Sequence, residues 1–106
     1  MSYRIYIGDP EDMENLRELY AFSKEQHEEL FSIIKNLDVV YCWLFEIQAY
    51  ETFMNYHVEE IKSLMLEIEC LMKLDILRDN VFLTCLLQAG KQAVVKNLQL
   101  LCSGDE

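Results

Sequence analysis

The side chains that could carry out catalysis are spread along the chain without a catalytic arrangement. His27 and His57 are far apart, and no serine lies in the G-x-S-x-G motif that holds a hydrolase nucleophile. Gly8, Gly90 and Gly104 are also widely separated, so no glycine-rich loop can bring several backbone N–H groups to a phosphate. We therefore expect no enzymatic activity and no nucleotide cofactor.

Metal binding is the second chemistry that these residue types could support. Di-metal helical bundles use inward-facing Glu-x-x-His motifs in pairs, whereas His57 precedes Glu60 in the reverse order and has no second copy. We expect His57 to be a hydrogen-bonded residue at the edge of the core, with a role in partner binding or in a pH response as the alternative. The cysteines lack C-x-x-C spacing and lie among apolar neighbours, which favours buried, reduced thiols; they are Cys42, Cys70, Cys85 and Cys102. The sequence predicts no metal site and no bound cofactor.

Negative charge is the feature with the clearest functional meaning. The formal net charge is -10, and the stretch 9–29 holds eight acidic residues against Arg17 and Lys24. Such a field repels nucleic acid and attracts basic surfaces, although acidity that serves only solubility stays an alternative. The candidate partner-binding residues are the acids of this stretch with one aromatic residue: Asp9, Glu11, Asp12, Glu14, Glu18, Glu25, Glu28, Glu29 and Tyr20.

Length and composition limit the architecture that can position these residues. A chain of 106 residues with 52% hydrophobic residues can bury one modest core, so we expect one domain over 1–106. The longest charge-free runs are too short to cross a bilayer. The first residues lack the apolar region of a secretory signal, so we expect a cytoplasmic protein without membrane contact.

Local patterns in the first third predict one strand and two helices. Tyr3, Ile5 and Ile7 alternate with other residues, which indicates a short strand over 3–7. Asp9-Pro10 has the form of a helix start. Ser23 and Gln26 form an S-x-x-Q capping box that starts the next helix, which ends near 36–38, where Asp38 could cap a third.

Helical spacing dominates the rest of the sequence. Apolar residues follow each other at intervals of four and three from Val40 to Met72, and no Gly or Pro interrupts 39–77, so we expect one long helix or two helices with a break near Asn55. Asp79-Asn80 should form the turn and cap before a last helix that ends at 103–104, with Gly90 allowing close approach of another helix or a slight bend. The predicted fold is all-α, a compact bundle of four to five helices with the short N-terminal strand.

Without a catalytic arrangement, an acidic and aromatic-rich helical domain is best interpreted as a binding protein. The leading hypothesis is a protein that neutralises a basic partner protein by occlusion, as an immunity protein, an antitoxin or an inhibitor of a nuclease-type toxin does. It predicts no direct contact with nucleic acid. The alternative is a structural or regulatory homodimer, or an adaptor, assembled through the Val40–Met72 apolar stripe.

Overall fold

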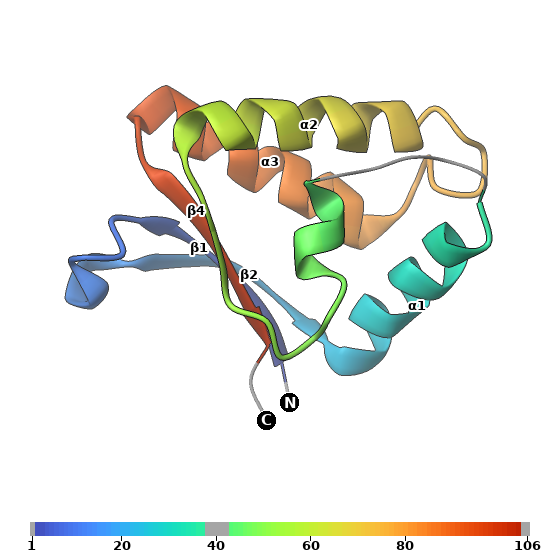
Figure 1. The fold of residues 1–106 in the computed structure, drawn as a ribbon, viewed down its shortest axis with the longest axis horizontal. Helices are drawn as coiled ribbons and strands as arrows, with labels where there is room; N and C mark the ends of the chain where they lie inside the picture. Colours follow the sequence, from blue (N-terminus) through green and yellow to red (C-terminus); the bar gives the residue numbers. More distant parts are fainter. Residues whose placement is uncertain (1, 38–42, 105–106) are drawn as a thin grey trace.

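The structure of the chain, a computed structural model, describes residues 2–37 and 43–104. Within these ranges three α-helices pack against an antiparallel sheet of four strands (Figure 1). Two 3-10 helices, η1 and η2, lie in the connections. The elements in chain order are β1 (Ser2–Gly8), η1 (Met13–Asn15), β2 (Arg17–Ser23), α1 (Lys24–Lys35), η2 (Leu44–Ile47), β3 (Met54–Tyr56), α2 (Val58–Leu71), α3 (Val81–Lys96) and β4 (Gln99–Gly104).

The sheet has the strand order β2-β1-β4-β3, and every neighbouring pair is antiparallel. β1 and β2 form a hairpin whose register shifts between Ile5 and Tyr6, so that one residue of β2 is left over as a bulge. The last strand, β4, pairs with β1 on one side and with the short β3 on the other. The sheet therefore joins the two ends of the described chain.

One face of the sheet carries the core. Tyr3, Ile5 and Ile7 of β1 are buried and alternate with half-buried residues, as expected of a strand with one covered face. The helices cover this inner face and contribute their own apolar residues to one cluster. Each fully buried Leu or Ile side chain contributes roughly 1.5–3 kcal/mol through removal from water. Members from the helices include Leu30, Ile34, Ile61, Leu64, Ile68, Phe82, Leu86 and Ala93.

Two of the helices begin at the residues that the sequence predicted. The Ser23 hydroxyl accepts a hydrogen bond from the Gln26 N–H at 3.1 Å, and the Gln26 side chain accepts one from the Ser23 N–H at 2.9 Å. The Asn80 side chain accepts from the Leu83 N–H at 2.9 Å and so caps α3. Both predicted starts are confirmed, because the cap satisfies N–H groups that the helix itself leaves without a partner.

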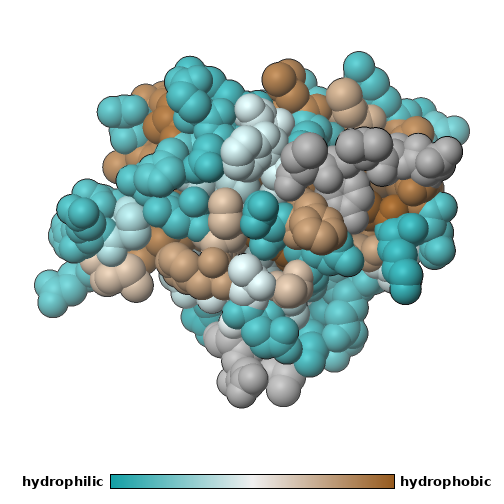
Figure 2. Space-filling view, in the orientation of Figure 1, coloured by the Kyte–Doolittle hydropathy of each residue, from teal (hydrophilic) through white to brown (hydrophobic). Residues whose placement is uncertain are grey.

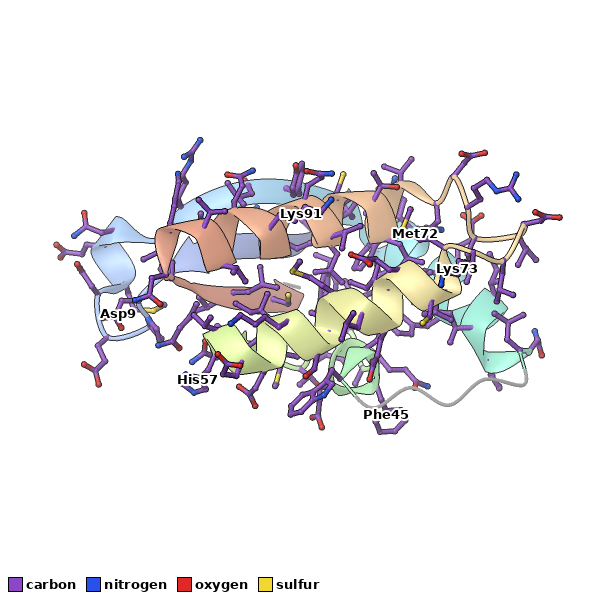
Figure 3. All side chains as sticks on the ribbon, turned by 90° about the horizontal axis from the view of Figure 1, so that it is seen from above. Asp9, Phe45, His57, Met72, Lys73 and Lys91 are labelled. Carbon is purple, nitrogen blue, oxygen red and sulfur yellow. The ribbon has the colours of Figure 1, made fainter. Side chains whose placement is uncertain are left out.

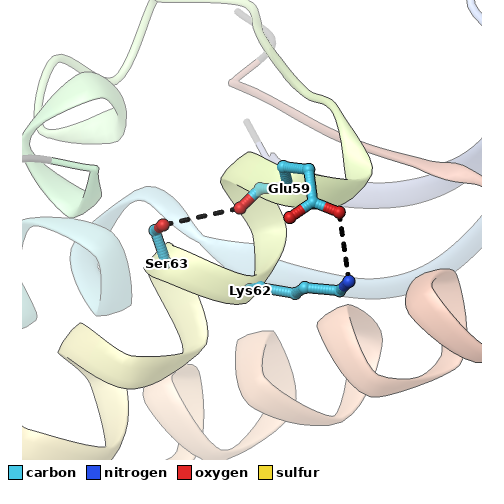
Figure 4. A network of polar contacts seen from close by, with 3 residues as sticks. All are labelled: Glu59, Lys62 and Ser63. Atoms are coloured by element: carbon cyan, nitrogen blue, oxygen red, sulfur yellow. Dashed lines mark hydrogen bonds and ion pairs between the residues drawn. The ribbon is translucent and has the colours of Figure 1, made fainter.

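Helices α2 and α3 approach each other closely at Gly90. A Cβ atom at this position would lie 3.1 Å from the Met65 side chain and 3.3 Å from Ile61, both on α2. Of the two predicted roles of Gly90, the close approach of another helix is confirmed. On the exposed side of α2, the Lys62 ammonium donates to the Glu59 carboxylate at 3.1 Å, and Ser63 donates to the Glu59 carbonyl (Figure 4).

The predicted all-α bundle is wrong, because the chain forms three further strands, β2, β3 and β4, besides the predicted strand at 3–7. The helix expected from Asp9-Pro10 is a loop with a single turn, η1, followed by β2. The last helix does not continue to 103–104. It ends at Lys96, where Asn97 adopts the left-handed conformation (φ 55°) that often terminates helices, and β4 follows.

The long central helix over 39–77 is also wrong. The chain does break near Asn55, but Asn55 lies in β3, and α2 begins only at Val58. Upstream, the backbone N–H groups of Trp43 and Leu44 donate to the Glu67 carboxylate at 2.9–3.0 Å, and the Tyr56 hydroxyl donates to the Trp43 carbonyl. These contacts hold the segment around η2 against α2, in place of further helix.

The Val40–Met72 stripe is accordingly not one helical surface. Its members Leu44, Ile47, Ile61 and Ile68 are buried in the core of the chain itself. Val40, like Asp38, Tyr41 and Cys42, lies outside the described residues. Met54, Val58, Met65 and Met72 are half-buried.

Candidate partner-binding surface

The structure separates the predicted partner-binding residues into two groups at opposite ends of the molecule. Asp9, Glu11, Asp12 and Glu14 lie in the loop 9–16 between β1 and β2, whereas Glu25, Glu28 and Glu29 lie on α1. The loop is at the left end of Figure 1 and α1 is at the right. Figure 3 labels Asp9 at the same end, with Met72 and Lys73 at the opposite one. The longest dimension of the molecule is 38 Å, so the acids do not form one face.

The loop 9–16 is shaped by two of its acids and leaves the other two available. The Asp9 carboxylate accepts from the Glu11 N–H at 2.9 Å, and the Asp12 carboxylate accepts from the Asn15 side-chain amide at 2.7 Å. Among the described residues, the carboxylates of Glu11 and Glu14 have no hydrogen-bond or ion-pair partner, and both residues are exposed. The loop therefore presents four negative charges without a basic residue of its own.

Gly8 sets the direction in which this loop leaves the sheet. Its φ of +153° lies in a region that side chains rarely adopt, and a Cβ atom would lie 2.7 Å from the Leu16 side chain. The chain can therefore turn sharply after β1 while Leu16 closes against it. This local packing fixes the loop next to the outer face of the sheet.

A hollow lies beside the loop on the outer face of the sheet, the face opposite the core. It measures about 420 Å³ and is lined by Arg4, Tyr6, Met13, Leu16, Phe53 and Ser103. Met13 is 61% exposed and Phe53 is 51% exposed, so two large apolar side chains face water at its rim. Figure 2 shows hydrophilic residues at this end of the molecule with hydrophobic residues next to them. We name the loop 9–16 together with this hollow the loop surface.

Two of the predicted residues have roles within the chain. The Glu18 carboxylate lies 3.0 Å from the Arg4 guanidinium across the β1–β2 pair, so a basic group of a partner would compete with Arg4 for it. Tyr20 is half-buried, packs against the core and stacks on Phe22 with ring centroids 6.4 Å apart. Both side chains therefore already have contacts within the chain.

His27 is the buried polar residue that the sequence reasoning missed. It is 1% exposed, and its ring packs on Tyr3 and Phe31 with centroids 4.5 and 4.8 Å apart. Its Nε2 lies 2.7 Å from the Ile47 carbonyl and must carry the proton, because a carbonyl only accepts. Burial lowers the pKa of His27, although the bond to Ile47 opposes this effect. His27 therefore serves as a neutral core residue.

The position of His57 differs from the expectation of a core-edge residue. It is exposed and precedes α2, and its backbone N–H donates to the Glu60 carboxylate at 2.8 Å. Among the cysteines, burial raises the pKa of the Cys85 and Cys102 thiols, whereas Cys70 is exposed. Over residues 2–37 and 43–104, no three His, Cys, Asp or Glu side chains come together as a metal would require.

Comparisons with known proteins assign no family to this fold or surface. No family model, no curated protein and no solved structure matches the chain. In the described part of the chain, every helix is too short or too polar to span a bilayer.

Proposed function

We propose that the chain binds a basic protein partner through the loop surface and neutralises that partner by covering it. An immunity protein or antitoxin acts on its target in this way. The observation that carries the proposal is that the loop with the available carboxylates of Glu11 and Glu14 also supplies the exposed Met13 to the hollow, whose lining includes the exposed Phe53.

Charge and apolar contact would contribute to different steps of binding. The four negative charges of the loop would raise the rate of encounter with a basic surface, and this effect weakens with added salt. Met13 and Phe53 would then lose their remaining contact with water, which stabilises the complex by about 1 kcal/mol for each half-exposed side chain. Apolar anchors of this kind mainly slow dissociation.

The test compares two double variants that remove the same charge. Glu11→Gln with Glu14→Gln changes the loop, and Glu28→Gln with Glu69→Gln removes two exposed acids elsewhere. The immobilised chain would first be used to retain basic proteins from its source cells, and one retained protein would be purified and titrated calorimetrically against each variant. A Phe53→Ser variant tests the apolar part.

We expect the loop variant to weaken binding by about two- to thirty-fold, and the matched control to leave it within about two-fold. Phe53→Ser should increase the dissociation rate with little change in the association rate. Equal losses in both double variants would mean that only net charge matters, and the proposal would then be wrong.

A further inference from the structure

A second hollow lies at the other end of the molecule, where α1, the segment 72–80 and the start of α3 meet. It measures about 470 Å³, and its lining includes Ile33 from α1, Ile76 from the segment and Phe82 from α3. In Figure 1 this junction is at the right, far from the loop surface at the left. We name it the α1–α3 hollow.

Apolar side chains form both the floor and the rim of the α1–α3 hollow. Phe82 is 2% exposed and belongs to the core, so the floor is fixed. Ile76 and Val81 are 62% and 59% exposed, although both are aliphatic residues. An apolar side chain from a partner could therefore cover both of them and remove them from water.

The charged groups of the hollow are all acidic. Among the described residues, its lining holds Glu29, Asp75 and Asp79 and no basic side chain. The Arg78 guanidinium pairs with Asp75, whereas the carboxylates of Glu29 and Asp79 have no such partner within the described residues. The two uncharged polar side chains of the lining, Gln26 and Asn80, already cap α1 and α3.

We propose that the α1–α3 hollow docks an extended basic segment of a protein, in which arginine or lysine flanks a single aliphatic residue. The aliphatic side chain contacts Ile76 and Val81 over Phe82, and the flanking cations face Glu29 and Asp79. Because the hollow and the loop surface lie at opposite ends of the long axis, one chain can hold two basic segments at once. This inference does not depend on the proposed function of the loop surface.

The experiment uses a synthetic peptide as the probe, in which two arginines flank one leucine within neutral glycine and serine residues. It is titrated into the 15N-labelled full chain that carries Glu11→Gln and Glu14→Gln, so that the loop surface is weakened beforehand. Amide shifts locate the peptide and give its affinity. Two control peptides replace the arginines by glutamates or the leucine by serine.

We expect shifts at the amides of Ile76, Val81 and Asp79, and a loss of affinity of about two- to thirty-fold when Glu29→Gln and Asp79→Asn are added. The serine and glutamate peptides should bind more weakly than the probe. Shifts confined to other surfaces, or an unchanged affinity in the Glu29 and Asp79 variant, would overturn the inference. Neither result would bear on the loop surface, which is tested with its own variants.

Discussion

Substitution of Gly90 tests how closely α2 and α3 pack. Alanine removes the helix penalty of glycine, about 1 kcal/mol, but its methyl group would lie 3.1 Å from the flexible Met65 side chain. The gain and the crowding oppose each other, so Gly90→Ala should change the free energy of unfolding by less than about 1 kcal/mol. Valine adds two more carbon atoms and cannot turn away from the contact, so Gly90→Val should cost about 1–3 kcal/mol.

The assay is urea unfolding followed by far-ultraviolet circular dichroism, in the wild type and in a Met65→Ala background. Met65→Ala opens space opposite Gly90, so Gly90→Val should cost about 1 kcal/mol less in that background than alone. Gly90→Ala provides the matched control for helix propensity. An equal cost of Gly90→Val in both backgrounds, or a cost below about 0.5 kcal/mol, would refute the close contact between the helices.

Three further predictions concern caps, protonation and thiols. Ser23→Ala and Asn80→Ala should each lower the free energy of unfolding by about 1 kcal/mol, measured by urea unfolding; no change would argue against the caps. Burial lowers the pKa of His27 in the folded chain. As the pH falls below about 6.5, the His27 side chain therefore binds a proton more readily in the unfolded chain than in the folded chain. The stability that neutral, buried His27 contributes is thus present above that pH and is lost as the pH falls. His27→Gln should show a smaller loss of stability than the wild type between about pH 7.5 and about pH 5.5, and an equal loss would exclude His27 as the cause. In the folded chain a thiol reagent followed by peptide mass spectrometry should label Cys70 and leave Cys102 unlabelled until urea is added.

Elements with a local signal were predictable from the sequence. β1 shows alternation over Tyr3, Ile5 and Ile7, and α1 and α3 start at side chains that form hydrogen bonds within three residues. Each of these signals involves neighbours in sequence, so it holds whatever the rest of the fold is. The close approach of another helix to α3 was likewise indicated by Gly90, a glycine inside an otherwise good helix pattern.

Elements that depend on distant contacts were not predictable in the same way. β4 includes the run Leu100, Leu101 and Cys102, all buried, so it lacks alternation and continues the helical spacing of α3. Asn97 was the available signal for the end of α3, since asparagine tolerates the left-handed conformation. The bulge in the β1–β2 pair disturbs the period of β2. Around η2, the backbone N–H groups of Trp43 and Leu44 donate to the carboxylate of Glu67, which lies more than twenty residues further along the chain.

The candidate site was predictable only in its chemistry. The sequence identified the acids of the stretch 9–29, but the prediction placed them on two adjacent helices. In the structure, one group lies in the loop 9–16 and the other on α1, at opposite ends of the molecule. Phe53 could not be assigned to the site, because it comes next to Tyr6 and Met13 only through the pairing of β3 with β4 and of β4 with β1. Tertiary contacts therefore decide which acids lie beside exposed apolar residues.

The central claim is that the loop surface is a docking site for basic protein segments. Its most direct test is the amide shift map of the 15N-labelled wild-type chain titrated with a synthetic peptide that carries lysines around one phenylalanine. The structure predicts shifts at Tyr6, Glu11, Glu14 and Phe53 that weaken with added salt and in the Glu11→Gln, Glu14→Gln variant. Shifts absent from these four residues, or unchanged by salt and by that variant, would contradict the claim.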